Sequence, residues 1–125
     1  MRQNLANAVE DDRVTESQRA TERIDDLFDA LNDGEVVRKA LFGNPALYTV
    51  GKAFVWADNT DARVQLKLPA VTGEGLIVAG FSEVGWMGPR PVKGWYTLVE
   101  PVDAQQLLEL AATARDHVRA EQARG

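Results

Sequence analysis

The feature that most constrains this fold is a change in hydrophobic periodicity along the chain. Between residues 16 and 31, apolar residues recur every three or four positions, which is the period of an amphipathic helix. After residue 34 the period shortens to about two, which is typical of β-strands, and it lengthens again from residue 104 onward. Strands enclosed by two amphipathic helices predict an α+β fold.

Both flanking helices carry end signals in the sequence. Thr15 is a good N-cap for the first helix, and Gly34 suits the chain just after its end. Asp103 and Gln106 have the spacing of a capping box at the start of the second helix. The expected helices cover residues 16–31 and 104–121.

Six segments between these helices have strand-like patterns: residues 35–42, 46–50, 53–57, 63–68, 82–87 and 93–100. Residues 69–80 contain two internal glycines, each of which costs a helix about 1 kcal/mol, so we expect a short, weak helix there. Most connections are short enough for hairpins, which favours a mostly antiparallel sheet with the helices on one face. The expected fold class is therefore α+β, a two-layer sandwich with N- and C-terminal amphipathic helices.

The segments 46–50 and 53–57 flank Gly51 and Lys52, which predicts a two-residue hairpin turn with glycine first. That turn places Leu47, Phe54 and Trp56 on one face and Tyr48, Val50, Ala53 and Val55 on the other. Neither set is polar, so something should cover the face that the helices leave free. A second copy of the chain is our leading candidate, and a loop or the N-terminal segment is the alternative.

Two positions suggest local rules for the sheet. Pro45 has no N–H for a central ladder, so we expect Gly43, Asn44 and Pro45 to break the strand pattern. Further on, Arg63, Gln65 and Lys67 alternate with aliphatic residues, which predicts a strand with one solvent-facing side.

Composition narrows the classes of function. A chain of 125 residues is expected to form one domain, here residues 15–122 after a flexible tail at residues 1–14. There is no cysteine, which fits a cytoplasmic protein, and neither a secretion signal nor a membrane-spanning run is visible. The formal net charge of −5 disfavours a nucleic-acid partner, which usually requires a basic surface.

Catalytic and metal-binding patterns are missing. The one histidine, His117, falls beside the apolar stripe of the last helix, and Ser82 lies in a stretch that misses the nucleophile-elbow pattern at its final glycine. One histidine and no cysteine leave no ordinary zinc shell. The acidic turn at 58–62 resembles a calcium loop, but Pro69 occupies the position of its last ligand. We expect that the chain is not an enzyme and that it binds neither a metal ion nor a cofactor.

One stretch remains as a candidate binding site. Arg90 and Lys93 are positive charges in a segment with Pro89 and Pro91, and an arginine beside aromatic rings can hold an anion or a planar group. The predicted binding residues are Trp86, Arg90, Lys93, Trp95 and Tyr96. In the alternative interpretation, the tryptophans are core residues on strands and the charges lie exposed at a turn.

The order of several short motifs resembles the N-terminal domain of the TfoX/Sxy family. The matching positions are Phe42, Gly43, Gly51, Lys52, Phe54, Leu66, Lys67, Leu68, Pro69, Arg90, Pro91, Lys93, Gly94 and Trp95. This resemblance covers roughly residues 20–120 and implies a sandwich of the secretion-chaperone-like type. The family includes regulators of natural competence, and the resemblance implies no catalytic residues.

The chain departs from that family at Leu41, where methionine is common, and has no counterpart of the C-terminal helical domain of full-length competence regulators. A more distant resemblance to the YjbR-like group, sometimes described as DNA-binding, is opposed by the acidic charge. We therefore expect a regulatory or adaptor domain that acts through protein contacts. The alternative is a small-molecule or nucleic-acid binding domain that uses Arg90, Lys93 and Trp95.

Overall fold

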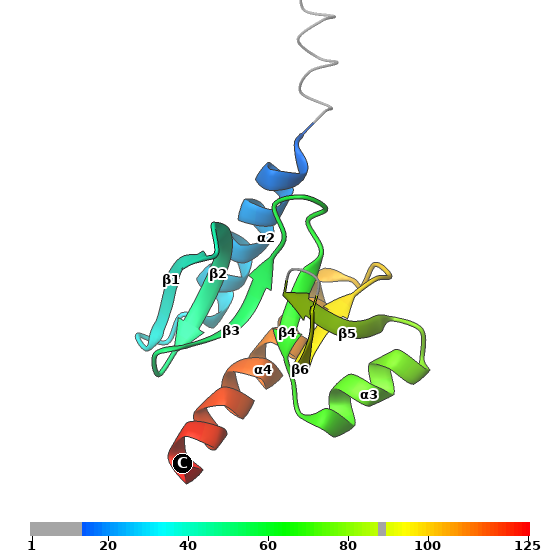
Figure 1. Cartoon of the computed structure of the whole chain (residues 1–125). Coiled ribbons are helices and arrows are strands. Elements are labelled where there is room, and N and C mark those ends of the chain that lie inside the picture. Colours follow the sequence, from blue (N-terminus) through cyan, green and yellow to red (C-terminus); the bar gives the residue numbers. More distant parts are fainter. Residues whose placement is uncertain (1–13, 88–89) are drawn as a thin grey trace, which may run out of the picture.

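The structure, a computed structural model, describes residues 14–87 and 90–125 (Figure 1). Its elements are α2 (Glu16–Leu31), β1 (Val36–Leu41), β2 (Asn44–Thr49), β3 (Lys52–Ala57), β4 (Val64–Lys67), α3 (Ala70–Val78), β5 (Ser82–Met87), β6 (Arg90–Leu98) and α4 (Ala104–Arg124). The predicted tail, apart from Val14, and Pro89 lie outside the described residues. The order of helices and strands matches the prediction.

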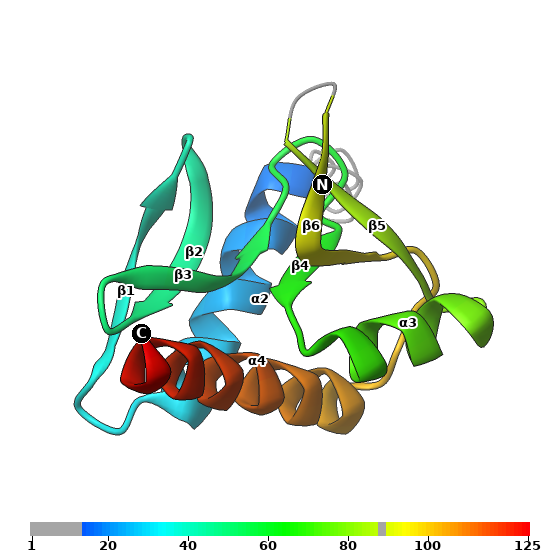
Figure 2. The same cartoon turned by 60° about the horizontal axis from the view of Figure 1, so that its bottom comes forward.

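The six strands form one antiparallel sheet in the order β1-β2-β3-β4-β6-β5. Strand β6 therefore lies between β4 and β5, and α3 connects these two strands along the chain (Figure 2). The predicted α+β sandwich is confirmed. Within the described ranges, each helix is too short or too polar to cross a membrane.

Both long helices begin at the predicted caps. The Thr15 hydroxyl accepts from the Gln18 backbone N–H at 3.0 Å, and the Gln18 side chain accepts from the Thr15 backbone N–H at 2.9 Å. Asp103 and Gln106 make the same reciprocal pair at the start of α4. Each capping box satisfies backbone donors that the first helical turn leaves free.

The helices bury one face of the sheet. The main core combines the apolar stripes of α2 and α4 with side chains from β1, β2, β3, β4 and β6, and Leu76 of α3 packs against it. Its helical members are Ala20, Ile24, Leu27, Leu31, Ala111, Ala114 and Val118, and its sheet members include Leu47, Phe54, Val55, Leu66 and Tyr96. We call this side the helix-covered face and the other side the open face.

The β2–β3 hairpin differs from the prediction by one residue. Its turn residues are Val50 and Gly51, with φ of 47° and 79°, and the pair Thr49–Lys52 closes it. Two successive positive φ angles define a type I′ turn, whose twist matches that of a hairpin. Valine seldom adopts positive φ, so the prediction took Gly51 as the first turn residue, whereas in the structure it is the second.

A β-bulge then reassigns the faces of the same hairpin. Leu47 pairs with Val55, whereas Tyr48 pairs with Ala53, so Phe54 is the extra residue in β3. Phe54 and Val55 consequently both enter the main core, together with Leu47. The predicted faces were therefore right for Leu47, Phe54, Tyr48 and Ala53 but wrong for Val55 and Trp56, which are exchanged. Trp56 lies on the open face, in a cluster with Ala46 and Trp95 against which Tyr48 and Ala53 pack.

Pro45 does not break its strand. It lies in β2 opposite Ala40, and the chain reversal occurs earlier, at Phe42 and Gly43, which both have positive φ. The missing N–H is tolerated because the pairing of β2 with β3 begins only at Ala46. The predicted break is therefore present at Gly43, but it does not include Asn44 and Pro45, which belong to β2.

Strand β4 also differs from the prediction, because the side expected to face solvent is partly buried. Val64 and Leu66 point into the main core as expected, but Gln65 on the opposite side is only 5% exposed. Its amide Nε2 donates to the Trp86 carbonyl oxygen at 3.3 Å. The open face is therefore partly covered by its own side chains.

Candidate functional site

A groove of about 560 Å³ opens on the open face and is the best candidate site. Three aromatic side chains contribute to its walls: Phe42 from the β1–β2 turn, Trp56 from β3 and Trp86 from β5. Phe42 is 80% exposed and Trp86 is 45% exposed, whereas Trp56 is 6% exposed. The first two therefore form a rim and Trp56 belongs to the floor. A volume of this size suits a small ligand.

Charged groups line the same groove. Asp58 and Asp61 come from the β3–β4 turn, Arg63 follows that turn, and Glu83 comes from β5. The Arg63 guanidinium lies 3.8 Å from the Asp61 carboxylate, and both side chains are about half exposed. The lining therefore contains three carboxylates and one cation, and the cation is already beside one of the carboxylates.

Hydrogen bonds hold the acidic turn in place. The Asp58 carboxylate accepts from the Thr60 backbone N–H at 2.7 Å, and the Asp61 carboxylate accepts from the Arg63 backbone N–H at 2.9 Å. Asn59 joins this turn to the β1–β2 turn, since its Nδ2 donates to the Gly43 carbonyl oxygen at 2.7 Å. The two turns thereby form one wall of the groove.

Two residues that line the groove each have a buried polar atom without a hydrogen-bond partner. Among the buried side-chain polar atoms in the described residues, Trp56 Nε1 and Thr97 Oγ1 are those that make no hydrogen bond. Each of these residues is 6% exposed, and both line the groove. A buried donor or acceptor without a partner costs about 1–3 kcal/mol, so such groups are uncommon and call for an explanation.

The structure does not bring the five predicted binding residues together. Trp86 lines the groove, and Trp95 lies nearly buried on the same face, beside Trp56. Tyr96 points to the other face and enters the main core, where burial, and secondly the charge of Glu74, raise its pKa. Neighbouring residues of a strand point to opposite faces, so Trp95 and Tyr96 cannot line one pocket.

The two predicted cations lie in a strand. Arg90 begins β6, opposite Met87, and Lys93 follows in the same strand. Both are exposed, and neither lines the groove. The expected loop therefore reduces to the connection at residues 88–89, which the structure does not describe.

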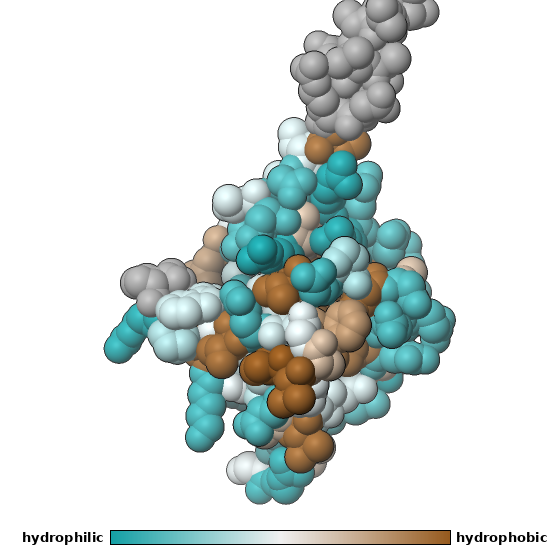
Figure 3. Space-filling view, turned by 90° about the vertical axis from the view of Figure 1, so that its right-hand side faces the viewer, coloured by the Kyte–Doolittle hydropathy of each residue, from teal (hydrophilic) through white to brown (hydrophobic). Residues whose placement is uncertain are grey.

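A second feature is the apolar surface around α3. Figure 3 views the side of the molecule that carries α3 and β5, and hydrophobic side chains gather on it. Val71 and Val78 are 87% and 89% exposed, and Ile77 and Phe81 are more than one third exposed. A hollow of about 420 Å³ lies between the end of α3 and α4, lined by Leu76, Phe81 and Leu110 among others. Exposed apolar patches of this kind often mark contact surfaces.

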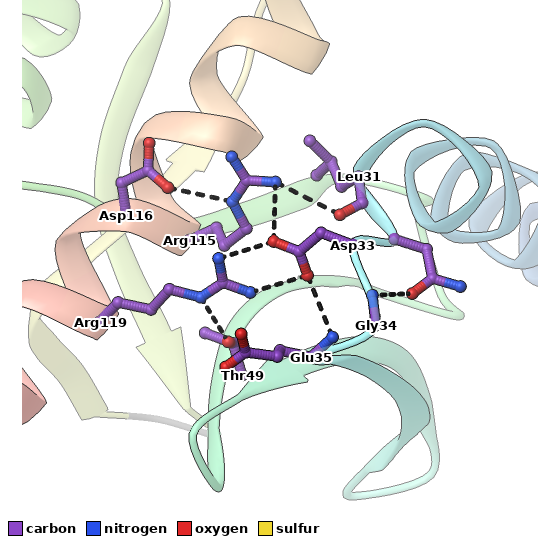
Figure 4. A network of polar contacts seen from close by, with 9 residues as sticks. Leu31, Asp33, Gly34, Glu35, Thr49, Arg115, Asp116 and Arg119 are labelled. Atoms are coloured by element: carbon purple, nitrogen blue, oxygen red, sulfur yellow. Dashed lines mark hydrogen bonds and ion pairs between the residues drawn. The ribbon is translucent and has the colours of Figure 1, made fainter.

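A polar network joins α4 to the α2–β1 connection and to β2 (Figure 4). Arg119 donates to both carboxylate oxygens of Asp33, at 2.8 and 3.1 Å, and its Nε donates to Thr49 Oγ1 at 2.8 Å. Arg115 donates to the Leu31 carbonyl oxygen at 3.3 Å. The Arg119 hydrogen bonds, followed by the Glu35 backbone N–H, hold the pKa of the Asp33 carboxyl well below its usual range. These groups satisfy one another, which indicates a structural clamp.

The residues that sequence analysis considered for catalysis are separated. Ser82 is buried in β5 and donates to the Thr97 carbonyl oxygen at 2.8 Å. His117 lies on α4, with Nε2 3.5 Å from the Glu121 carboxylate. Within residues 14–87 and 90–125, no three side chains of the His, Cys, Asp or Glu types are placed to hold a metal ion.

Sequence analysis missed most of the groove. Trp56 was assigned to the same face as Phe54, and the acidic turn was treated only as a turn. The available signal was Thr97, a polar residue between Tyr96 and Leu98 near the end of β6, together with Gln65 in the neighbouring strand. These two residues pair directly across β4 and β6 at the floor of the groove.

The comparisons with known proteins identify no relative. No protein-family model matches the chain, and no curated protein or solved structure gives a significant match. The resemblance to the TfoX/Sxy N-terminal domain therefore stays an expectation from the sequence.

Proposed function

We propose that this chain is a non-catalytic binding domain that holds a small ligand in the groove of its open face. The observation that carries the proposal is a groove in which two lining residues, Trp56 and Thr97, each have a buried polar atom, Nε1 and Oγ1, without a hydrogen-bond partner. Both atoms lie beneath the groove surface, so a ligand that shifts the side chains covering them would satisfy both and offset the cost of burying them.

Other features of the groove support the same proposal. Its floor is built on strands β3, β4 and β6, which hold Trp56, Gln65 and Thr97 in the hydrogen-bonded sheet. Its rim comes from a hairpin turn and from β5, which forms one edge of the sheet. The exposed rings of Phe42 and Trp86 can cover a ligand that enters between them.

The proposal is tested by screening a set of small fragments of neutral, cationic and anionic type by ¹H–¹⁵N NMR. Fragments that bind the groove should shift the indole N–H resonances of Trp56 and Trp86. The variant Trp86→Ala, followed through the Trp56 resonance because its own indole is removed, should bind these fragments about tenfold more weakly or not at all, as expected for a truncated aromatic anchor. Phe81→Ala is the matched control, since Phe81 is similarly exposed but does not line the groove. If no fragment moves either indole resonance, the proposal is refuted.

The α3 surface favours a second candidate function, contact with another protein, of which a second copy of this chain is the simplest case. Val71 and Val78 are almost fully exposed, and the adjacent strand β5 is an edge of the sheet with free backbone groups. This retains the expectation of an adaptor that acts through apolar contacts, but places the contact on α3 rather than on the sheet.

Light scattering at high micromolar concentration tests that candidate. The wild-type chain should be dimeric, and the double variant Val71→Asp, Val78→Asp should be monomeric because it places charges in the contact. Val37→Asp, at an exposed site on the opposite edge strand, should leave the dimer intact. A monomeric wild-type chain would exclude self-association through α3.

A further inference from the structure

The charges in the groove lining indicate what kind of ligand it takes. Asp61 already has Arg63 beside it, whereas no described residue forms an ion pair with Asp58 or Glu83. Two carboxylates thus remain without a charged partner among the described residues, Asp58 in the acidic turn and Glu83 on β5. A groove with this balance attracts positive charge and disfavours phosphates and carboxylates.

The aromatic rim favours the same sign of charge. The faces of Phe42, Trp56 and Trp86 carry the negative side of the ring quadrupole, which attracts an ammonium or guanidinium group. Phe42 and Trp86 keep much of their surface exposed, so an incoming group can reach their rings. Aromatic rings and carboxylates in one groove are the usual elements of a site for organic cations.

The floor adds a second requirement. An indole N–H can only donate, so Trp56 Nε1 needs a hydrogen-bond acceptor on the ligand. The Thr97 hydroxyl can donate to the same kind of oxygen or accept from a neighbouring donor. The ligand should therefore carry a carbonyl or hydroxyl oxygen in addition to its positive charge.

A metal ion is a poorer fit for this groove. The carboxylates of Asp58, Asp61 and Glu83 are not grouped closely enough to ligate one ion together, as the absence of any such cluster in the described ranges indicates. The aromatic rings supply no metal-ligand oxygen or nitrogen. An organic cation can reach separate carboxylates and the rings at the same time.

We infer that the groove binds a small organic cation with a hydrogen-bond acceptor, its charge beside Glu83 and its acceptor directed toward Trp56 Nε1 beneath the floor. This inference rests on the proposed ligand-binding function and specifies its chemistry. Two sources share this chemistry. One is a free amino-acid derivative, and the other is an exposed arginine or lysine of another protein, with its backbone carbonyl as the acceptor.

The test uses matched probes that differ in charge. N-acetyl-L-arginine amide is compared with the neutral N-acetyl-L-citrulline amide, N-acetyl-L-lysine amide with its Nε-acetyl form, and choline with 3,3-dimethylbutanol. Binding is followed by the Trp56 and Trp86 indole resonances. At least one cation should bind about tenfold more tightly than its neutral partner, and added salt should reduce that preference.

Variants locate the charge that matters. Glu83→Gln should weaken the cation about two- to thirtyfold and leave the neutral partner unchanged, which is the range that a single charge or cation–π contact supplies. Glu74→Gln is the control, because Glu74 is an exposed acid on α3 and does not line the groove. Trp56→Phe should weaken the binding of probes that carry a hydrogen-bond acceptor.

The outcomes separate this inference from the proposed function. If every neutral partner binds as well as its cation, or if anionic fragments bind best, the cation inference is refuted while the groove remains a ligand site. If none of the probes or fragments moves the indole resonances, both the inference and the proposed function fail. If N-acetyl-L-arginine amide binds, a peptide with an internal arginine is added as a further probe, and its failure to bind would identify a free small molecule as the source.

Discussion

On the helix-covered face of the sheet, α2 and α4 bury a continuous apolar core, whereas the open face is covered mainly by its own tryptophans. The two faces also treat buried polar groups differently. Thr49 is 1% exposed, and its hydroxyl accepts from Arg119 at 2.8 Å. Thr97 is 6% exposed, and its hydroxyl has no partner. The comparison indicates that one face is completed by the chain itself and the other is completed by something that binds.

The largest difference is expected between aromatic residues on the two sides. Phe54 is fully buried in the main core, so Phe54→Ala should lower the free energy of unfolding by about 3–5 kcal/mol. Phe42→Ala, at the 80% exposed rim of the groove, should change it by less than about 0.5 kcal/mol. Chemical denaturation measures both changes in unfolding free energy, with the dependence of that free energy on denaturant concentration held the same for all variants. Similar losses at the two sites would contradict the division between a core face and a binding face.

The second comparison, between two glycines of α3, tests whether this helix packs on the helix-covered face. A Cβ added at Gly73 would lie 2.2 Å from Cζ of the buried Tyr96 ring, whereas one added at Gly75 would meet nothing within 4 Å. Gly73→Ala should therefore lower stability by about 1–3 kcal/mol, as overpacking does. Gly75→Ala should raise it by up to about 1 kcal/mol, because alanine favours the helix. Equal effects in thermal unfolding would mean that α3 does not pack against Tyr96 as described.

A matched pair of threonines gives the third test. Thr97→Val removes a hydroxyl that has no partner while keeping the shape, so stability should rise by about 1 kcal/mol and ligand binding should weaken. Thr49→Val removes an acceptor that Arg119 uses, so stability should fall by about 1–2 kcal/mol. Changes of opposite sign in the unfolding free energy, measured with denaturant, would support the contrast between the two faces. A loss of stability in both variants would show that Thr97 is satisfied within the chain.

Much of the helix-covered face could be predicted from the sequence. The apolar spacing of α2 and the caps at Thr15 and Asp103 are local properties that a few residues encode. The strand limits followed from the same kind of pattern. Local signals of this type remain readable without knowledge of the partners in space.

The open face could not be predicted in the same way. One bulged residue, Phe54, moves Trp56 to the other side of the sheet, and periodicity does not reveal a bulge. The groove also depends on the Asn59 contact to Gly43, which joins two turns that are separate in the sequence. The candidate site thus arises from register and long-range contacts, whereas the predicted Arg90 and Lys93 site relied on sequence proximity alone.

The smallest expected effect concerns how the helix-covered face is held together at low pH. The pKa of Asp33 is lowered in the folded chain, first by the Arg119 hydrogen bonds and then by the Glu35 backbone N–H, so the unfolded chain binds its proton more readily. The stability that this carboxylate supplies is therefore present above about pH 4, the usual range of an unfolded aspartate, and is lost as the pH falls further. Asp33→Asn should melt at a lower temperature than wild type at pH 7, and the two curves should converge as the pH falls below about 4. Asp29→Asn, at an exposed site of α2 outside the network, should follow wild type throughout. A difference between Asp33→Asn and wild type that persists unchanged to pH 2 would mean that the clamp depends on the shape of the side chain and not on its charge.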